Sequence, residues 1–136
     1  MNIFNEKPSV EETMAIRLAS GADPVHEHIV NQGLDHSICV MVARDDQSNI
    51  VGMGRIIGDG GCYYQIVDMM VRPEFHGKGI EEQILTRLLD YLNANASMEA
   101  TVMVMSDVGS IKLYQTSGFK LVYPDYYGMV RMVGQS

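Results

Sequence analysis

The sequence is short of positive charge, of cysteine and of long apolar runs. Its 136 residues hold 10 Lys and Arg against 17 Asp and Glu, a formal net charge of −7. This balance argues against nucleic acid and against an anionic membrane as partners, because both are bound through basic side chains. Two cysteines without CxxC spacing are too few for a disulfide framework. No apolar run approaches the roughly 20 residues that cross a bilayer, and residues 1–10 lack signal-peptide character, so we expect a cytoplasmic protein.

The length and the apolar content predict one folded domain over residues 1–136. Hydrophobic residues make up 46% of the chain and charged residues 20%, close to the average for a soluble folded protein. A chain of this length leaves little material for a second core. Residues 1–68 carry four basic and ten acidic side chains, whereas residues 69–136 carry six and seven. The acidic first half favours a cationic binding partner.

Helix and strand patterns alternate along the chain without an internal repeat. Ser9 and Glu12 have capping-box spacing at a helix start, and Gly33 predicts the end of the next helix. Apolar steps of three and four from Ile80 to Leu92 predict a long helix. The predicted helices are 10–20, 24–32, 79–95 and 109–117, and the predicted strands are 38–43, 50–57, 63–71, 100–105, 119–122 and 128–133. This order predicts an α/β or α+β fold, with helices packed on a mixed sheet.

The segment after the strand at 63–71 carries the clearest chemical pattern. A turn through Arg72 and Pro73 leads into the loop His76-Gly77-Lys78-Gly79, which opens directly onto the long helix. The first turn of a helix leaves backbone N–H groups without partners, and the helix dipole makes that end partly positive. The two glycines remove Cβ atoms where a ligand would approach the backbone, and Lys78 adds a positive charge. The loop is therefore a candidate phosphate site.

Two common nucleotide-binding motifs do not fit this chain. A Walker A loop requires Ser or Thr after Gly-Lys, but Gly79 follows Lys78. Gly52 and Gly54 lie within a predicted strand, and the next glycine, Gly58, misses the GxGxxG spacing. Neither ATP nor NAD is predicted.

A second motif accompanies the loop further along the chain. HGKGIE at 76–81 is followed by LYQTSGF at 113–119. In this order the two segments resemble the signatures of the GNAT superfamily of N-acetyltransferases, which read Q/R-x-x-G-x-G/A and LY-x-x-x-GF. The resemblance covers about residues 38–122. It implies a mixed, mainly antiparallel twisted sheet flanked by about four helices, with acetyl-CoA as co-substrate and no metal.

The resemblance implies where acetyl-CoA would bind. Backbone groups of Met69, Met70 and Val71 would contact the pantetheine and the acetyl carbonyl, with an N–H directed at the developing oxyanion. The pyrophosphate would be held by the loop and the first helical turn, which comprise His76, Gly77, Lys78, Gly79, Ile80, Glu81 and Glu82.

The resemblance also implies catalytic and acceptor residues. Tyr114 takes the position of the general acid beside the thioester sulfur, where a phenol of pKa near 10 serves a thiol leaving group of pKa near 8.5. Asp107 stands where many relatives carry Asn, and it is a candidate general base alongside Asp68 and a bridging water. Tyr126 and Tyr127 lie in the region that helps to wall the acceptor pocket, which we expect between residues 20–36 and the C-terminal strands.

Two positions depart from the family pattern. His76 replaces the first Gln or Arg, and it still offers a hydrogen-bond donor. Glu81 replaces the small last residue, which places a carboxylate near the expected pyrophosphate. At about 5 Å each phosphate charge would repel it by about 1 kcal/mol in water and by about 3 at an effective dielectric constant of 20. We expect weakened rather than abolished CoA binding.

The sequence therefore predicts an enzyme that moves an acetyl group from acetyl-CoA directly to a primary amine of a small molecule or a peptide. The alternative is a non-catalytic acyl-CoA-binding or sensing module on the same fold, which Glu81 and Asp107 favour. No metal is predicted, because His26 and His28 diverge to different faces of a predicted helix and His36 lacks a Cys partner at ligand spacing. A predicted edge strand at 128–133 is suited to pairing in a homodimer.

Overall fold

The computed structural model describes residues 1–135, and these group into two compact units, residues 1–104 and the chain from Met105 onward. The first unit contains, in chain order, β1 (Asn2–Asn5), α1 (Val10–Ala19), α2 (Glu27–Asp35), β2 (Cys39–Arg44), β3 (Ile50–Gly58), β4 (Tyr63–Val71), the 3-10 turn η1 (Pro73–Phe75), α3 (Ile80–Asn95) and β5 (Thr101–Val104). The second contains the 3-10 turn η2 (Val108–Ser110) and α4 (Ile111–Thr116). Within the described residues, no helix is long and apolar enough to span a membrane.

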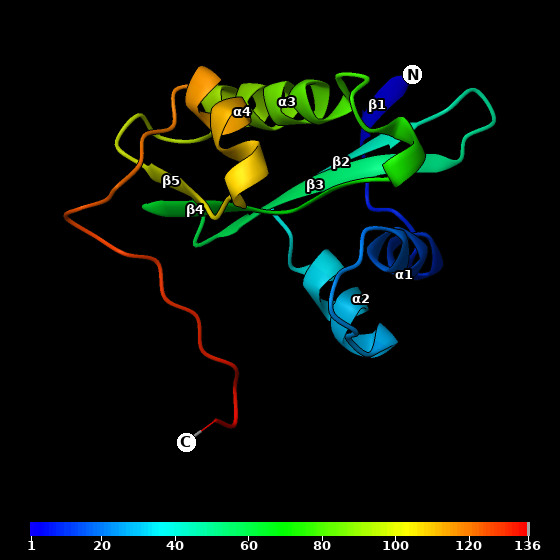
Figure 1. Ribbon diagram of the computed structural model, residues 1–136, viewed down its shortest axis with the longest axis horizontal. Coiled ribbons are helices and arrows are strands. Elements are labelled where there is room, and N and C mark those ends of the chain that lie inside the picture. The colour runs from blue at the N-terminus through cyan, green and yellow to red at the C-terminus, as the bar shows by residue number, and fades with distance from the viewer. Residues whose placement is uncertain (136) are drawn as a thin grey trace. The chain divides into compact units, whose positions relative to one another are not determined.

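The strands of the first unit form a single sheet in the order β1-β2-β3-β4-β5 (Figure 1). The pairs β1–β2, β2–β3 and β3–β4 are antiparallel, and β4–β5 is parallel. A parallel pair requires a crossover connection, which α3 provides here. The predicted α+β class with a mixed, mainly antiparallel sheet is confirmed, with five strands and four α-helices among the described residues.

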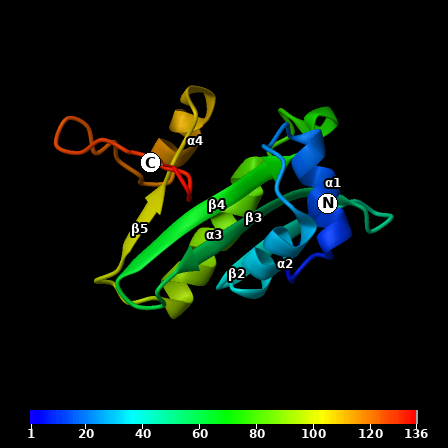
Figure 2. The same cartoon turned by 90° about the horizontal axis from the view of Figure 1, so that it is seen from below.

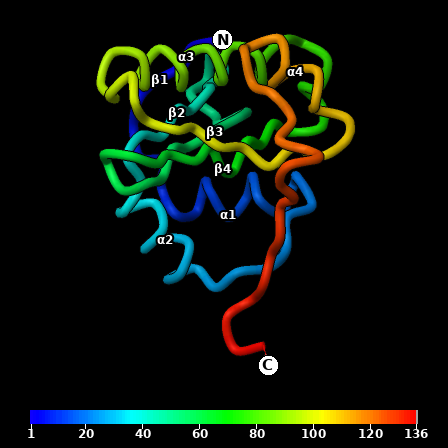
Figure 3. Tube along the Cα trace, turned by 90° about the vertical axis from the view of Figure 1, so that its left-hand side faces the viewer, coloured from blue at the N-terminus to red at the C-terminus, as the bar shows by residue number. Residues whose placement is uncertain are grey.

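Helix α3 covers one face of the sheet, while α1 and α2 cover the other (Figures 2 and 3). The predicted apolar stripe is the buried side of α3, with Ile80, Ile84, Leu85, Leu88 and Leu92. On β3, a Cβ added at Gly52 or Gly54 would lie 3.0 Å from a methyl group of Ile84 or Leu88. The two glycines therefore let α3 approach the sheet closely. Each buried Leu or Ile contributes about 1.5–3 kcal/mol, so packing holds this helix.

The opposite face of the sheet carries a second apolar layer. It consists of Ile16, Leu34, Val40, Val42, Ile50, Met53 and Met70. Ile16 comes from α1 and Leu34 from α2, so each of these helices contributes one buried aliphatic side chain to the layer. Helix α2 differs from the predicted boundaries at both ends, since it begins at Glu27 and continues through Gly33 to Asp35. The burial of Leu34 accounts for the extension beyond Gly33. One such burial outweighs the cost of about 1 kcal/mol for glycine within a helix.

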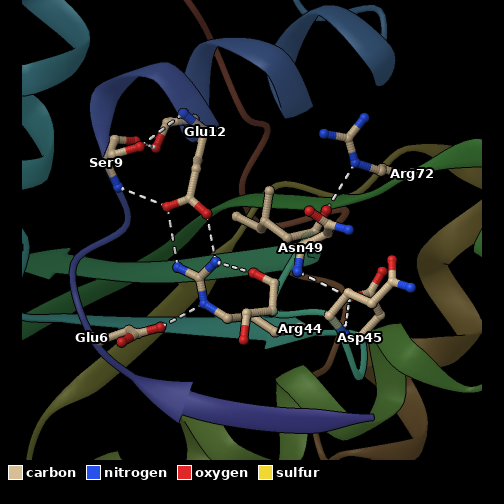
Figure 4. A network of polar contacts seen from close by, with 11 residues as sticks. Glu6, Ser9, Glu12, Arg44, Asp45, Asn49 and Arg72 are labelled. Carbon is tan, nitrogen blue, oxygen red and sulfur yellow. Dashed lines mark hydrogen bonds and ion pairs between the residues drawn. The ribbon is translucent and has the colours of Figure 1, made fainter.

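A polar network fixes the start of α1 on the sheet (Figure 4). The predicted capping box is present, because Ser9 Oγ accepts from the Glu12 N–H and Glu12 Oε1 accepts from the Ser9 N–H, both at 3.1 Å. Arg44, at the end of β2, donates to both oxygens of Glu12 at 2.5 and 3.1 Å, and its Nε donates to Glu6 Oε1 at 2.7 Å. Hydrogen bonding from Arg44 holds the pKa of Glu12 below its ordinary value.

The chain after α4 differs from the prediction. In the described residues, 119–122 and 128–133 form no strands, so these two predictions were wrong. The Tyr126 N–H instead donates to the Val122 carbonyl at 3.0 Å, which makes a local turn. An apolar run becomes a strand only where a neighbouring strand accepts its backbone hydrogen bonds. Conversely, the short strand β1 went unpredicted, and it exists through pairing of Asn2–Asn5 with β2.

The Arg44–Glu12 pair makes a prediction about stability and pH. Glu12→Gln retains the capping box but removes the charge, and it should lower the free energy of unfolding at pH 7 by about 1 kcal/mol, a value discounted for partial exposure. Because the folded pKa of Glu12 is lowered, its contribution is present above the unfolded pKa and is lost as pH falls through the folded pKa. Urea unfolding should therefore show a larger difference between Glu12→Gln and the wild type at pH 7 than at pH 3. Glu11→Gln, exposed on the same turn, is the control, and an equal loss in both variants would contradict the assignment.

Candidate active site

Strand β4 pairs with β5 over only part of its length. The parallel register runs from Tyr63 opposite Thr101 to Ile66 opposite Val104, where β5 ends. Strand β4 continues to Val71. Along 67–71, the edge of β4 on the β5 side therefore faces no strand among the described residues. The predicted backbone contacts, Met69, Met70 and Val71, all lie in this stretch, where a ligand could form hydrogen bonds with backbone groups on the open edge of β4.

The same stretch contains a β-bulge. Met53 lies opposite Met70, but Arg55 lies opposite Val67, so Gly54 alone faces the two residues Asp68 and Met69. A bulge of this kind leaves an extra residue outside the ladder and bends the strand. Asp68 has φ +54°, a left-handed conformation that is uncommon for a residue with a Cβ. The backbone next to Met69 is thus turned away from regular strand geometry.

The loop between β4 and α3 is organised by short contacts. A ring nitrogen of His76 lies 2.9 Å from the Val71 carbonyl oxygen, and the Lys78 ammonium lies 5.3 Å from the centre of the Phe75 ring. Gly77 and Gly79 both have φ +77°. A Cβ at Gly77 would meet nothing within 4 Å, so these glycines are required for their left-handed backbone rather than for space.

The start of α3 combines a positive backbone end with acidic side chains. Gly79 is the N-cap residue and, within the described residues, no side chain caps the helix there. The first N–H groups of a helix have no partner inside it. Glu81 is half-buried and Glu82 is exposed in the first turn. The backbone favours an anion at this end, whereas the two carboxylates oppose one, and Lys78 is the nearest cation along the chain.

The remaining predicted site residues belong to the second unit. Asp107 is exposed, and its Oδ1 accepts from the Ser110 N–H at 2.9 Å, which caps the following turn. Tyr114 on α4 is buried, and its ring meets Phe119 edge to face at 5.7 Å. Tyr126 and Tyr127 are exposed, and Tyr127 contacts Tyr123 edge to face at 5.3 Å. The roles assigned to these residues stay predictions.

Two arginines at this site were missed by sequence reasoning. Arg55 donates to Asp68 Oδ2 at 2.7 Å, and Arg17 lies 3.6 Å from Asp68 Oδ1. Both oxygens of Asp68 are thus paired with guanidinium groups, and its role as a base stays a prediction. One signal was present in the sequence, because Arg55 is the lone charge in the apolar and glycine-rich strand 50–57.

Both cysteines are free thiols, and they differ in burial. Cys39 is buried, and burial raises the pKa of its thiol to about 11. Cys62 is exposed in the turn before β4. Among residues 1–135, no three His, Cys, Asp or Glu side chains are grouped as metal ligands would be.

Comparison with known proteins identifies the family. The model of an acetyltransferase (GNAT) domain matches residues 13–129 and so spans both compact units. The chain belongs to the GNAT acetyltransferase family. An uncharacterised N-acetyltransferase from Pyropia yezoensis is 27% identical over 82 residues, which are 60% of this chain and 46% of that protein. The chain thus spans about half the length of this curated relative.

Solved structures agree with this GNAT assignment. A protein of unknown function from meticillin-resistant Staphylococcus aureus, described as a probable acetyltransferase, is 28% identical and has a TM-score of 0.90, covering 96% of this chain and 98% of that one. A GNAT family acetyltransferase from Streptococcus pneumoniae is 22% identical with a TM-score of 0.81, covering 98% of both chains, a likeness that concerns the fold. The GNAT domain described here therefore has close structural counterparts.

The left-handed backbone at the start of α3 makes a prediction about stability. Gly79→Ala should lower the free energy of unfolding by about 1–2 kcal/mol, because a Cβ disfavours φ +77°. Gly79→Asn should cost less, since Asn tolerates this conformation. Gly61→Ala is the control, because its φ lies outside the left-handed range and a Cβ there meets only ordinary contacts. Urea unfolding would contradict the assignment if Gly79→Ala and Gly61→Ala had equal effects.

Proposed function

We propose that this GNAT domain is an N-acetyltransferase that moves an acetyl group from acetyl-CoA directly to a primary amine. The observation that carries the proposal is the parting of β4 from β5 after Ile66, immediately before a glycine loop at the start of α3. Free strand-edge groups suit the amides of pantetheine, and a helix start with left-handed glycines suits a pyrophosphate. The residues of this stretch therefore fit acetyl-CoA as a substrate.

In the proposed reaction the amine nitrogen attacks the thioester carbonyl carbon. A C–N bond forms, the C–S bond breaks, and negative charge develops on the carbonyl oxygen before the thiol leaves. A backbone N–H group at the bulge, near Met69, would donate to this oxygen, a form of preorganised stabilisation that is effective in acyl transfer. By the family pattern, Tyr114 gives its hydroxyl proton to the departing sulfur. The proton lost by the amine passes to solvent through water, or to Asp107.

The proposed acceptor is a small-molecule or peptide amine. The excess of acid in residues 1–68 favours a cationic acceptor, and exposed Tyr126 and Tyr127 are proposed to contact it. The same charge balance supports a protein that does not use nucleic acid or a membrane surface as partner. A cytoplasmic location is proposed from the lack of signal-peptide character in residues 1–10. A homodimer stays part of the proposal, although the strand at 128–133 that first motivated it is not formed.

A second candidate function, binding of acyl-CoA without turnover, is favoured by the two carboxylates in the first turn of α3. Glu81 replaces a small residue of the family motif, and Asp107 already caps η2. Both features reduce the groups available for catalysis or cofactor contact. This candidate shares the binding site with the enzyme but predicts no release of thiol.

The enzyme proposal predicts binding and turnover together. Isothermal titration at pH 7.5 should give micromolar affinity for acetyl-CoA, and a panel of butylamine, putrescine, lysine and a peptide with a free N-terminus should include one acceptor that releases thiol. Tyr114→Phe should lower kcat by about 10- to 100-fold with acetyl-CoA affinity retained, the low end for a general acid because a thiol leaves readily. Tyr63→Phe, exposed at the start of β4, is the matched control. Absence of heat at millimolar acetyl-CoA would overturn the proposal, and binding without turnover of any amine would favour the second candidate.

The charge at Glu81 makes a separate prediction about affinity. Glu81→Gln keeps the side-chain volume and removes the repulsion expected toward a pyrophosphate, so the Kd for CoA should fall by about five- to tenfold. The ratio of the wild-type Kd to the variant Kd should be smaller at high salt, because exposed charges are screened. Glu99→Gln, exposed beyond the end of α3, should leave the Kd unchanged. Unchanged affinity in Glu81→Gln would mean that this carboxylate points away from the ligand.

A further inference from the structure

Asp68 joins the bulge in β4 to both helices on the same face of the sheet. Its carboxylate accepts from Arg55 Nε at 2.7 Å and faces Arg17 Nη1 at 3.6 Å. Arg55 lies beside it on β3, and Arg17 comes from α1. The side chains of the three residues are only about a fifth exposed, at 23% for Asp68 and 17% for each arginine. Partial burial reduces the screening of these ion pairs.

The two arginines are themselves anchored to the helical layer. Arg55 Nη1 donates to the Gly33 carbonyl at 3.1 Å and to Ser37 Oγ at 3.0 Å, at the end of α2 and just after it. Arg17 Nη2 donates to the Asp23 carbonyl at 2.9 Å, in the connection between α1 and α2. The carboxylate is therefore held by two guanidinium groups from separate elements, β3 and α1, and each of these is hydrogen-bonded in turn to the helical layer. We refer to Arg17, Asp68 and Arg55 as the bulge clamp.

The clamp stabilises an uncommon backbone conformation at Asp68. Its φ of +54° lies in the left-handed region, which is uncommon for residues with a Cβ although Asp and Asn adopt it more often than others. The residue that follows, Met69, directs its side chain to the other face, where its methyl group would lie 3.3 Å from a Cβ added at Gly54. The clamp on one face and this packing on the other together define the path of the strand at 68–69.

We propose that Asp68 is a positioning residue for acetyl transfer, which acts through the clamp to hold the backbone N–H group of Met69, in the bulge, toward the thioester carbonyl. This role rests on the proposed function. It differs from the role of a base, because both oxygens of Asp68 are occupied by ion pairs. It also links the α1–α2 layer, on the side where the acceptor is proposed to bind, to the groups that polarise the acetyl carbonyl.

The test compares variants that separate backbone conformation from the clamp. Asp68→Gly keeps access to φ +54° and removes the carboxylate, while Asp68→Asn keeps an oxygen acceptor for Arg55 and tolerance of the left-handed backbone. With the fastest amine of the panel, Asp68→Gly should lower kcat by about 10- to 100-fold. Removing an oxyanion donor lowers kcat by about 100- to 1,000-fold, and a misdirected donor should have a smaller effect than a missing one. The KM for acetyl-CoA should change by less than about threefold, because the pyrophosphate site is untouched. The kcat of Asp68→Asn should lie between that of Asp68→Gly and that of the wild type.

Two further measurements keep the test decisive. Asp90→Asn, which removes an exposed carboxylate from α3, is the matched control and should retain wild-type kcat. Amide hydrogen exchange at Met69 and Met70 should become faster in Asp68→Gly, and Arg17→Gln should show a smaller effect of the same kind if Asp68→Gly does not fold. A kcat within about twofold of wild type in Asp68→Gly, or a kcat loss matched by an equal rise in KM, overturns the positioning role. If wild-type protein transfers no acetyl group to any amine, the proposed function fails and this role falls with it.

Discussion

Strand β4 has two different neighbours, and neither pairs with it regularly along its full length. On one side β5 stops opposite Ile66, and on the other the register with β3 slips at Asp68 and Met69. Backbone groups in a sheet normally satisfy one another, so a strand that escapes pairing keeps hydrogen-bonding capacity for something else. Everything proposed for this chain depends on that local freedom, because it offers backbone donors at the point where a glycine loop and a helix start follow directly.

The two faces of the sheet hold this strand by different means. On one face the packing is apolar, and α3 sits close because Gly52 and Gly54 present no Cβ to Ile84 and Leu88. On the other face an apolar layer is bordered by ion pairs, with Arg44 on Glu12 at one place and Arg55 with Arg17 on Asp68 at another. Apolar contact is tolerant of direction, whereas a hydrogen-bonded guanidinium requires a defined geometry. Precision at the bulge therefore comes from the charged face.

The electrostatics of the site are a balance rather than a simple attraction. The start of α3 has unpartnered N–H groups and Lys78 beside it, but Glu81 and Glu82 occupy its first turn. Acidic residues at a helix start stabilise the helix itself, by about 0.3–1 kcal/mol each. The same charges oppose a pyrophosphate, because the carboxylates and a bound anion would both interact with the same positive end of the helix. A chain of net charge −7 adds to the repulsion at long range, which salt screens.

Local rules accounted for much of this protein. The strand at 63–71, the buried stripe of α3 and the capping box at Ser9 follow from apolar period and side-chain chemistry within a few residues, and so does the glycine loop. The bulge, the clamp from Arg17 and Arg55, and the strand β1 could not be read in this way. Each depends on a partner distant in sequence, and apolar runs such as 128–133, which find no such partner among the described residues, do not become strands. The sequence by itself determined most of the helices and strands, and the family motif. The tertiary structure decided which backbone groups of β4 stay free, because pairing is a property of two strands and not of one.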